Sequence, residues 1–507
     1  MGNKKFSRRE FLGALAAASS QLILRAPLAG LVGATLLPLK KANAWTRKNR
    51  FVFLYFDGGI RGYETFSPQL PASRALSSGE IQTSDHVPRA LIENGRVMPN
   101  YATKELGGGY SLVPGTHANI TLDGQSVYAP PIFMASNGLR YGFCVADFLQ
   151  FAAQTTMIQG VTTSVDHGPA AQILLTGSAF DLAFPRPPID CLLASKLGGG
   201  LLLPHLIWTR SNYVPRSFPQ DNAQLNLGFP INGTGYRNFL KKLVGSPLAK
   251  TESSYVGDKA AAALRAYWDA TNESMGETLQ NPANLSYLKE MQVLRSSRDQ
   301  LWQSTIIGGA GTAIDSFVSA ARTTVDATVG ADIGGTVDSL LPALGMAKYA
   351  LDRELSSVVM MNIGMGRWDA HGGWYPSHPG HYRAHFCAIA EFLKRIDLNT
   401  TTVVICNELG RTTSFNQLNG TDHHPGSPIL LIGGKLGQGV SFGGTDAFLS
   451  PLNVNPDSGA AVTSGGLRLK PVHLLALLLE YAGYEKGRPI ETIMGITEAP
   501  AFLRKLL

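Results

Sequence analysis

Short apolar runs alternate with longer amphipathic segments along much of the chain. Five short runs, largely aliphatic or aromatic, lie at residues 51–56, 155–161, 358–363, 402–406 and 428–432. Runs of this length that end in polar or glycine-containing turns are typical of buried strands. Amphipathic spacing predicts helices at 382–398 and 472–481, and a short helix is expected at 170–175. Strands that alternate with helices indicate an α/β fold with a mostly parallel central sheet.

Two long stretches interrupt this alternation. Residues 67–143 are irregular and rich in glycine, proline and serine, and residues 185–340 combine a loop-rich part with helical spacing. A chain of 507 residues is long enough to bury a large core and still carry such additions. We therefore expect one domain over residues 45–507, with insertions near 67–143 and 185–340.

Residues 1–44 have the composition of an export signal. The segment Ser7-Arg8-Arg9-Glu10-Phe11-Leu12 resembles the twin-arginine motif, and an Ala/Leu-rich stretch leads from it to a small-residue site at Ala42-Asn43-Ala44. The alternative is an uncleaved membrane anchor, but Arg25 and Pro27 interrupt the apolar run before it reaches the roughly 18 residues that a span requires. We predict cleavage after export by the twin-arginine translocase, and a mature protein without a transmembrane anchor in the periplasm or outside the cell.

The basic charge of the chain does not indicate a nucleic-acid partner. Of the net charge of +7, residues 1–44 contribute +6, from seven lysines and arginines and one glutamate. The predicted mature protein is therefore nearly neutral, too weakly charged to attract a polyanion over a broad surface.

The four cysteines are widely separated and form no CxxC pair. They occupy positions 144, 191, 387 and 406. Folding before export favours reduced, buried thiols, with two disulfides as the alternative. The spacing gives no indication of a zinc–thiolate site.

Carboxylates and histidines follow four of the predicted strands. The groups are Asp57 with Glu64, Asp166 with His167, Asp369 with His371, and Glu408 with Asp422, His423 and His424. In a parallel sheet the carboxyl ends of the strands share one edge, so the sheet would gather these side chains. The mixture suits a divalent metal, with zinc preferred and manganese, magnesium or calcium as further choices.

Several of these residues have a second interpretation. Asp422 is either a ligand or a partner that orients His423. Glu408 is either a ligand or the ion-pair partner of Arg411, and Arg411 either grips an anionic substrate or pins the loop. His167 is either a ligand or a nucleophile, with Thr163 and Ser164 as hydroxyl alternatives.

Four motifs resemble a known family. They are GGIRGYETFSP (58–68), DHGPAAQILLTG (166–177), WDAHGG (368–373) and NELGRT with NGTDHHP (407–425). They are similar to motifs of twin-arginine-exported bacterial proteins known as the domain of unknown function numbered fifteen hundred and one. That family is placed in the alkaline phosphatase and sulfatase superfamily.

The resemblance implies a fold and a ligand set. The fold would be an alkaline-phosphatase-like three-layer sandwich. By position, Asp369, His371 and His423 resemble one metal site. Glu408 stands where that superfamily has a metal-binding aspartate, and Asp57 or Glu64 would serve a second site. The chain departs from the superfamily pattern in having His167 where alkaline phosphatase has its serine nucleophile, and Leu409 where a metal-binding histidine is common.

These features predict an exported, metal-dependent hydrolase of a phosphate or sulfate ester, with His167 and Arg411 contacting an anionic small-molecule or polymer substrate. One alternative is a non-catalytic periplasmic or cell-surface binding or assembly protein on the same scaffold. A second is a mutase or transferase that passes on a phosphoryl group.

Overall fold

The computed structural model describes most of the predicted mature chain. It covers residues 49–69, 74–75, 81–82, 110–116, 118–122, 125–129, 131–178, 187–198, 201, 205–209, 228–232, 304–363, 368–372, 378–413, 416, 418 and 420–507. The predicted signal peptide, residues 1–44, lies outside the described residues, as do parts of both predicted insertions.

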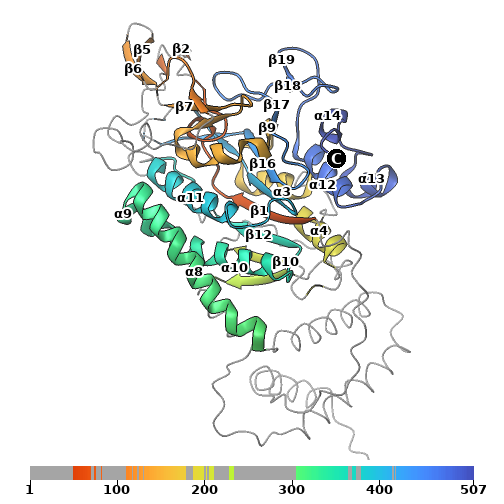
Figure 1. Ribbon diagram of the computed structural model, residues 1–507. Helices are drawn as coiled ribbons and strands as arrows, with labels where there is room; N and C mark the ends of the chain where they lie inside the picture. Colours follow the sequence, from red (N-terminus) through yellow and green to blue (C-terminus); the bar gives the residue numbers. More distant parts are fainter. Residues whose placement is uncertain are drawn as a thin grey trace, which may run out of the picture.

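A central sheet of eight strands organises the fold (Figure 1). The strands that follow the predicted apolar runs are β1 (Arg50–Phe56), β9 (Thr155–Thr162), β12 (Val358–Asn362), β13 (Thr401–Asn407) and β16 (Gly426–Gly433). The other three are β10 (His205–Thr209), β11 (Gly228–Asn232) and β17 (Val440–Gly443). The predicted strands are confirmed, each within two residues at either end.

The sheet is mixed but mostly parallel, as expected for an α/β protein. Its strand order is β11-β10-β12-β1-β13-β16-β9-β17. The strand β16 pairs antiparallel with both β13 and β9, whereas every other neighbouring pair is parallel. Only β16 therefore runs against the common direction. The loop that precedes β16 consequently reaches the same edge of the sheet as the carboxyl ends of β1, β9, β12 and β13.

Both faces of the sheet are buried, which explains the continuous apolar runs. In β1, Val52, Leu54 and Phe56 belong to one core, and Phe51, Phe53 and Tyr55 belong to the core on the other face. Each position from Phe51 to Phe56 is thus apolar because each side chain meets a packed layer, not water.

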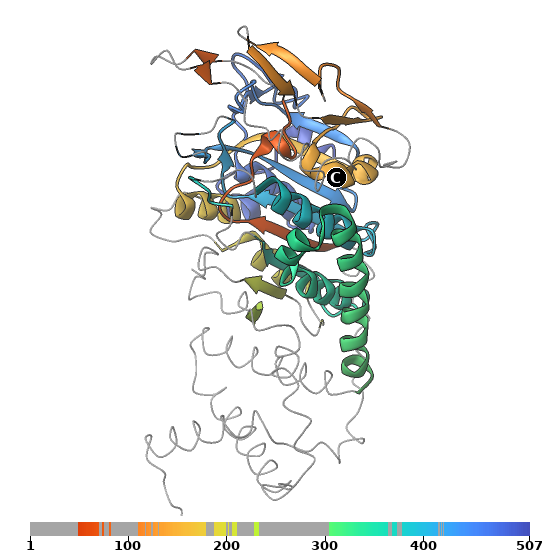
Figure 2. The ribbon, with the colours of Figure 1, turned by 90° about the vertical axis from the view of Figure 1, so that its left-hand side faces the viewer.

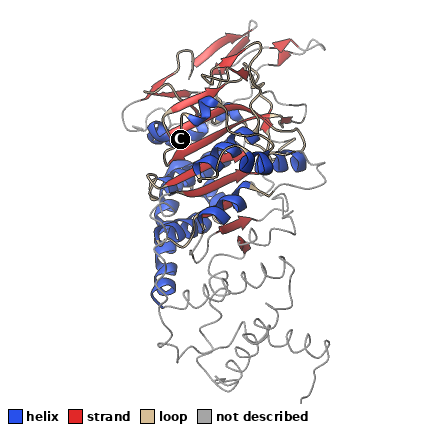
Figure 3. Ribbon diagram, turned by 90° about the vertical axis from the view of Figure 1, so that its right-hand side faces the viewer, coloured by secondary structure: helices blue, strands red, loops and turns tan. Residues whose placement is uncertain are grey.

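Helices form those two layers (Figures 2 and 3). One core includes α8 (Ser304–Val329), α10 (Leu340–Asp352), α11 (His378–Leu393) and the 3₁₀ segment η2 (Phe143–Gln154). The other includes α3 (His167–Thr176), α4 (Ile189–Leu197), α12 (Pro471–Tyr481), α13 (Arg488–Met494) and α14 (Ala501–Arg504). Among the described residues, no helix is long and apolar enough to cross a membrane.

The predicted helices are present, but α3 begins three residues and α11 four residues before the predicted start. The helix expected at 382–398 is α11, which ends at Leu393. Residues beyond it turn away from the helix, but Ile396 and Leu398 still pack against the core. The apolar spacing therefore continues past the point where the helical hydrogen bonds stop. The helix α3 ends at Gly177, whose φ of +70° suits a glycine cap.

The predicted insertion at 67–143 contains short antiparallel strands where the structure describes it. The strand β7 (Ile132–Ala135) pairs with β4 (Tyr110–Leu112) and β8 (Arg140–Gly142). Two more antiparallel pairs accompany them, β2 (Arg74–Ala75) with β3 (Ile81–Gln82) and β5 (Ala118–Leu122) with β6 (Gln125–Ala129). The four cysteines are free and buried, in line with the expectation of reduced thiols.

Candidate metal centre

Side chains from four separate segments meet at one edge of the sheet. His167 is the first residue of α3, just after β9, and Glu408 follows β13 directly. Asp369 and His371 come after β12, and His423 lies in the two-residue strand β15 (His423–His424) that precedes β16. The shared direction of β9, β12 and β13, and the opposite direction of β16, account for this convergence.

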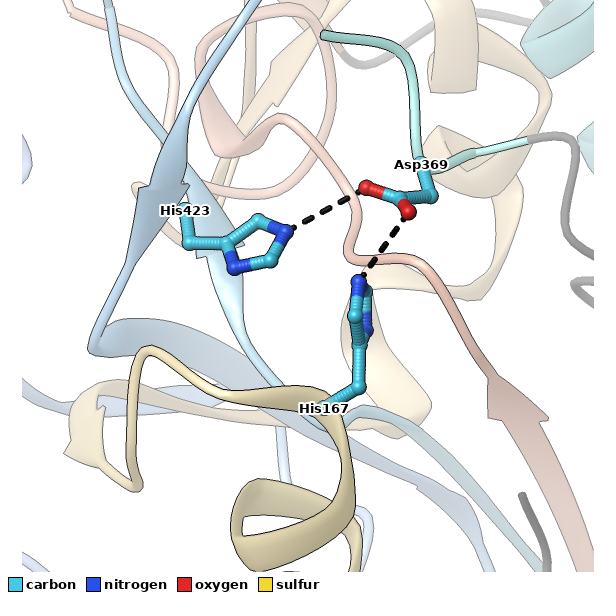
Figure 4. A group of neighbouring side chains, drawn as sticks. All are labelled: His167, Asp369 and His423. Atoms are coloured by element: carbon cyan, nitrogen blue, oxygen red, sulfur yellow. Dashed lines mark hydrogen bonds and ion pairs between the residues drawn. The ribbon is translucent and has the colours of Figure 1, made fainter.

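Asp369 is the centre of the group (Figure 4). Its Oδ2 lies 3.2 Å from Nε2 of His167, and its Oδ1 lies 3.2 Å from Nε2 of His423. Nε2 of His371 lies 3.1 Å from the same Oδ1. The ligand-type atoms of His167, Asp369 and His423 all lie within 4.8 Å of one another, a set of the kind that holds a metal ion.

Each of the three histidines turns its Nδ1 toward a hydrogen-bond acceptor. The partner of His167 is a carboxylate oxygen of Glu408, that of His423 is the carbonyl oxygen of Val165, and that of His371 is Oδ1 of Asp422 at 3.1 Å. A ring that donates from Nδ1 presents the lone pair of Nε2 on its other side. The three Nε2 atoms therefore lie around the Asp369 carboxylate, an arrangement of nitrogen and oxygen atoms that can hold a divalent cation.

Glu408 is fully buried and fixes the orientation of His167. One oxygen contacts His167 Nδ1 and accepts a hydrogen bond from the Gly58 amide at 2.7 Å, and the other accepts one from the Tyr55 hydroxyl at 2.6 Å. The hydrogen bond to Glu408 raises the pKa of His167 above its ordinary value, although burial opposes the shift. A carboxylate behind an imidazole makes the ring a more basic ligand and is common at metal sites.

Arg411 is also buried and braces the other side of the cluster. Its Nε donates to the Gly58 carbonyl at 2.8 Å, its Nη1 to the Thr421 carbonyl at 2.9 Å and its Nη2 to Oδ1 of Asp369 at 2.6 Å. Burial favours the neutral form of Asp369, but hydrogen bonds from Arg411 and His423 outweigh it and hold its pKa well below the usual range. The Asp369 carboxylate is therefore charged at neutral pH.

Gly58 allows the turn after β1 to approach Asp369 closely. Its φ is +88°, and a Cβ at this position would lie 2.6 Å from the backbone nitrogen of Asp369. Because a side chain would clash there, the close approach requires glycine.

The remaining predicted site residues have other partners. Asp57 is buried and accepts a hydrogen bond from Asn362 at 3.2 Å. Glu64 is buried beside Arg61, with which it forms an ion pair, and burial raises its pKa. Neither belongs to the set formed by His167, Asp369 and His423.

Asp422 lies at the exposed mouth of the cluster, where it contacts the ring of His371. It also accepts a hydrogen bond from Asn416 at 3.0 Å. The sequence suggested that Asp422 orients His423, whereas in the structure Asp422 contacts His371. His424 points elsewhere, since its Nδ1 accepts from the Gly426 amide at 3.2 Å.

Tyr55, Val165 and Asn416 contribute to the site and were not singled out from the sequence. Tyr55 looks like one more apolar residue of a buried strand, and Val165 acts through its backbone carbonyl. Asn416 lies within a polar loop, where its type gives no indication of a contact with Asp422. Only the folded loop contacts distinguish these residues from their neighbours.

The fold and the cluster together define an α/β protein with a histidine–carboxylate group at the strand ends. A family model described as a protein of unknown function, DUF1501, matches residues 48–458, and the chain belongs to this family. No curated protein matches the chain.

Proposed function

We propose that this protein is an exported, metal-dependent hydrolase of a phosphate or sulfate ester. The observation that carries the proposal is the convergence of three Nε2 atoms on the ionised Asp369 carboxylate, with every Nδ1 turned to an acceptor. The proposed fold relationship is to the alkaline phosphatases and sulfatases, and the mostly parallel sheet with a site at its strand ends supports it.

The metal would be held by His167, Asp369 and His423, with His371 completing the set. Nitrogen and carboxylate ligands suit zinc, and manganese is a further choice. A bound divalent cation supplies Lewis-acid polarisation of an ester oxygen and a lowered pKa for coordinated water. Burial lowers the pKa of His423, which favours the neutral ring that coordination requires.

The other residues support these ligands or face the substrate. Glu408 fixes the ring of His167, and Arg411 keeps Asp369 charged and in place. Both are fully buried, so we assign them positioning roles. His371 and Asp422 are exposed at the mouth, where an anionic ester would reach the metal. The proposed substrate is an anionic small molecule or polymer outside the inner membrane, reached after twin-arginine export.

The burial of Arg411 favours a second candidate function. Its guanidinium donates to two backbone carbonyls and to Asp369. These bonds suit a role in holding the surrounding segments together more than a role in binding an anionic substrate. A non-catalytic binding or assembly protein with a structural metal on this scaffold would use Arg411 in this way. A third candidate function is the transfer of a phosphoryl group to an acceptor other than water, and the same assays detect it.

Metal analysis and an ester panel test the proposal together. The mature protein, purified without chelators, should contain a divalent metal, and less than about half an equivalent would overturn the hydrolase proposal. A panel of a phosphomonoester, a phosphodiester and a sulfate ester should show an activity that Asp369→Ala abolishes. The control is Asp352→Ala, which removes an exposed carboxylate paired with Lys348 at the end of α10. Metal without turnover of any ester would favour the binding protein.

A further inference from the structure

A second group of metal-ligand side chains lies within the core between α4 and β10. Asp190 and Cys191 are in the first turn of α4, and His205 is the first residue of β10. Their exposed fractions are 3%, 1% and 0%. One ligand-type atom from each lies within 4.8 Å of the other two. None of the three belongs to the candidate metal centre.

The polar atoms of this group are poorly satisfied. Among the described residues, no hydrogen bond reaches Nδ1 of His205 or Oδ1 of Asp190. Nε2 of His205 lies 3.0 Å from Oδ2 of Asp190, but the contact lacks the alignment of a hydrogen bond. A buried polar atom without a partner has lost its hydration and gained no hydrogen bond in exchange, which is unfavourable, and more so when the atom is charged. An uncompensated group of this kind would weaken the core.

A simple ion pair does not account for the arrangement. It would use one nitrogen of His205 and one oxygen of Asp190, and it would leave the adjacent thiol without a role. A nucleophilic or redox-active cysteine does not account for it either. Burial raises the pKa of the Cys191 thiol, with the charge of Asp190 adding to the effect, whereas reactive cysteines have a lowered pKa and partial exposure.

We propose that Asp190, Cys191 and His205 bind a zinc ion. Thiolate, imidazole and carboxylate are the zinc ligands found in proteins, and the thiolate discriminates against magnesium and calcium. Binding replaces the S–H bond of Cys191 with a metal–sulfur bond and releases the proton to solvent. The charge of the ion offsets the negative charge of Asp190, and the lone pair of His205 coordinates the ion.

The zinc would tie the start of α4 to the start of β10. The helix packs on β10 and β12, close to one end of the central sheet. The sequence did not suggest this site, because only one of its ligands is a cysteine and His205 comes from a different element.

Cobalt substitution tests this proposal separately from the candidate metal centre. The described ligands of that centre are nitrogen and oxygen atoms, so a near-ultraviolet thiolate-to-cobalt charge-transfer band reports only on a cysteine ligand. We expect the band in full-length protein produced in cobalt-supplemented medium. It should disappear in Cys191→Ala and persist in Cys387→Ala, which removes a buried thiol from the opposite core. Absence of the band from the unmodified protein, or its persistence in Cys191→Ala, would overturn the proposal.

Two further measurements do not depend on the folding of Cys191→Ala. Zinc X-ray absorption of the unmodified protein should show a sulfur ligand at about 2.3 Å, and a shell of nitrogen and oxygen alone would contradict the proposal. His205→Gln should lose one equivalent of zinc, the one bound by Asp190 and Cys191. His423→Ala should also lose one equivalent, the one bound in the candidate metal centre. If zinc were lost only from His423→Ala, the hydrolase proposal would stand and the proposed zinc site at Asp190, Cys191 and His205 would be overturned.

Discussion

Nε2 of His371 lies 2.9 Å from Nε2 of His423, and each ring turns its Nδ1 toward an acceptor. The carbonyl of Val165 can only accept, so His423 must donate from Nδ1. Asp422, whose pKa is lowered by hydrogen bonds from Asn416 and His371 in spite of burial, is an acceptor for His371 in the same way. The two Nε2 atoms therefore lie on the sides of the rings that face each other and Asp369, where a bound divalent cation would join them.

Replacing His423 should remove metal, and replacing its neighbour should not. His423→Ala deletes a nitrogen aimed at Asp369, so we expect metal content in this centre to fall by at least tenfold at limiting free metal. His424→Ala is the matched control, because its ring contacts the Gly426 backbone instead. Inductively coupled plasma mass spectrometry on both variants provides the measurement. Equal metal loss in the two variants would show that the effect is structural.

Glu408→Gln should weaken metal binding through His167. The amide cannot both accept from the Gly58 and Tyr55 donors and provide the charge that His167 faces, so the ring loses its anchor. Loss of such a supporting carboxylate costs about 10- to 100-fold in metal affinity. Competition with a chromophoric chelator measures that affinity. Glu391→Gln, a buried carboxylate on α11, is the control and should bind metal normally.

Gly58→Ala should disturb the centre more than an alanine at a similar backbone angle elsewhere. Gly58 and Gly330 have φ values of +88° and +84°, but a Cβ at Gly330 meets no atom within 4 Å. Both substitutions carry backbone strain of about 1–2 kcal/mol. Only Gly58→Ala also pushes against Asp369, so it alone should lose metal and ester hydrolysis. Unfolding midpoints in urea measure the backbone strain that both variants share, and metal content measures the clash with Asp369 that only Gly58→Ala has. Normal metal content in Gly58→Ala would contradict the proposed clash.

The ion pairs of Glu391 should make stability depend on acid pH. Burial opposes ionisation, but hydrogen bonds from Lys394 and Arg395 lower the pKa of Glu391 below its unfolded value of about 4.3. Its stabilising contribution is therefore fully present above that value and is lost as the pH falls through the lower folded pKa. Urea unfolding of the unmodified protein and Glu391→Gln, from pH 7 down to pH 3, should show a stability difference that shrinks on acidification. A difference that grew toward low pH would contradict this assignment.

Conservative changes to the arginine pair should block export. Arg8→Lys with Arg9→Lys preserves charge but removes the motif that the twin-arginine translocase reads. We expect an uncleaved precursor in the cytoplasm, seen by fractionation. Intact mass of the exported unmodified protein should place its first residue after Ala44. Unchanged export of the double variant would exclude this route.

Much of the fold could be predicted from the pattern of the chain. The run 51–56 is apolar at every position and its counterparts are largely apolar, because both faces of the sheet are covered, and such runs appear directly in sequence. The carboxylates and histidines after these runs could also be recognised, because strand ends share an edge. The family relationship rests on those same motifs.

Other relationships depend on contacts between distant segments. No local pattern indicates that β16 runs against its neighbours, and that reversal is what carries His423 to Asp369. Arg411 and Glu408 were recognised as chemistry-bearing residues, but only their burial distinguishes a brace from a substrate contact.

The sequence by itself determined five of the eight strands of the central sheet and the helices α3, α11 and α12, because hydrophobic spacing reflects the faces that must be buried. It also determined which strand ends carry ligand-type side chains. The tertiary structure alone decided that the Nε2 atoms of His167, His371 and His423 aim at one carboxylate, and that Asp190, Cys191 and His205 share one buried point. The reason is physical: ring orientation and partner choice depend on hydrogen bonds across more than 200 residues, which no local pattern records.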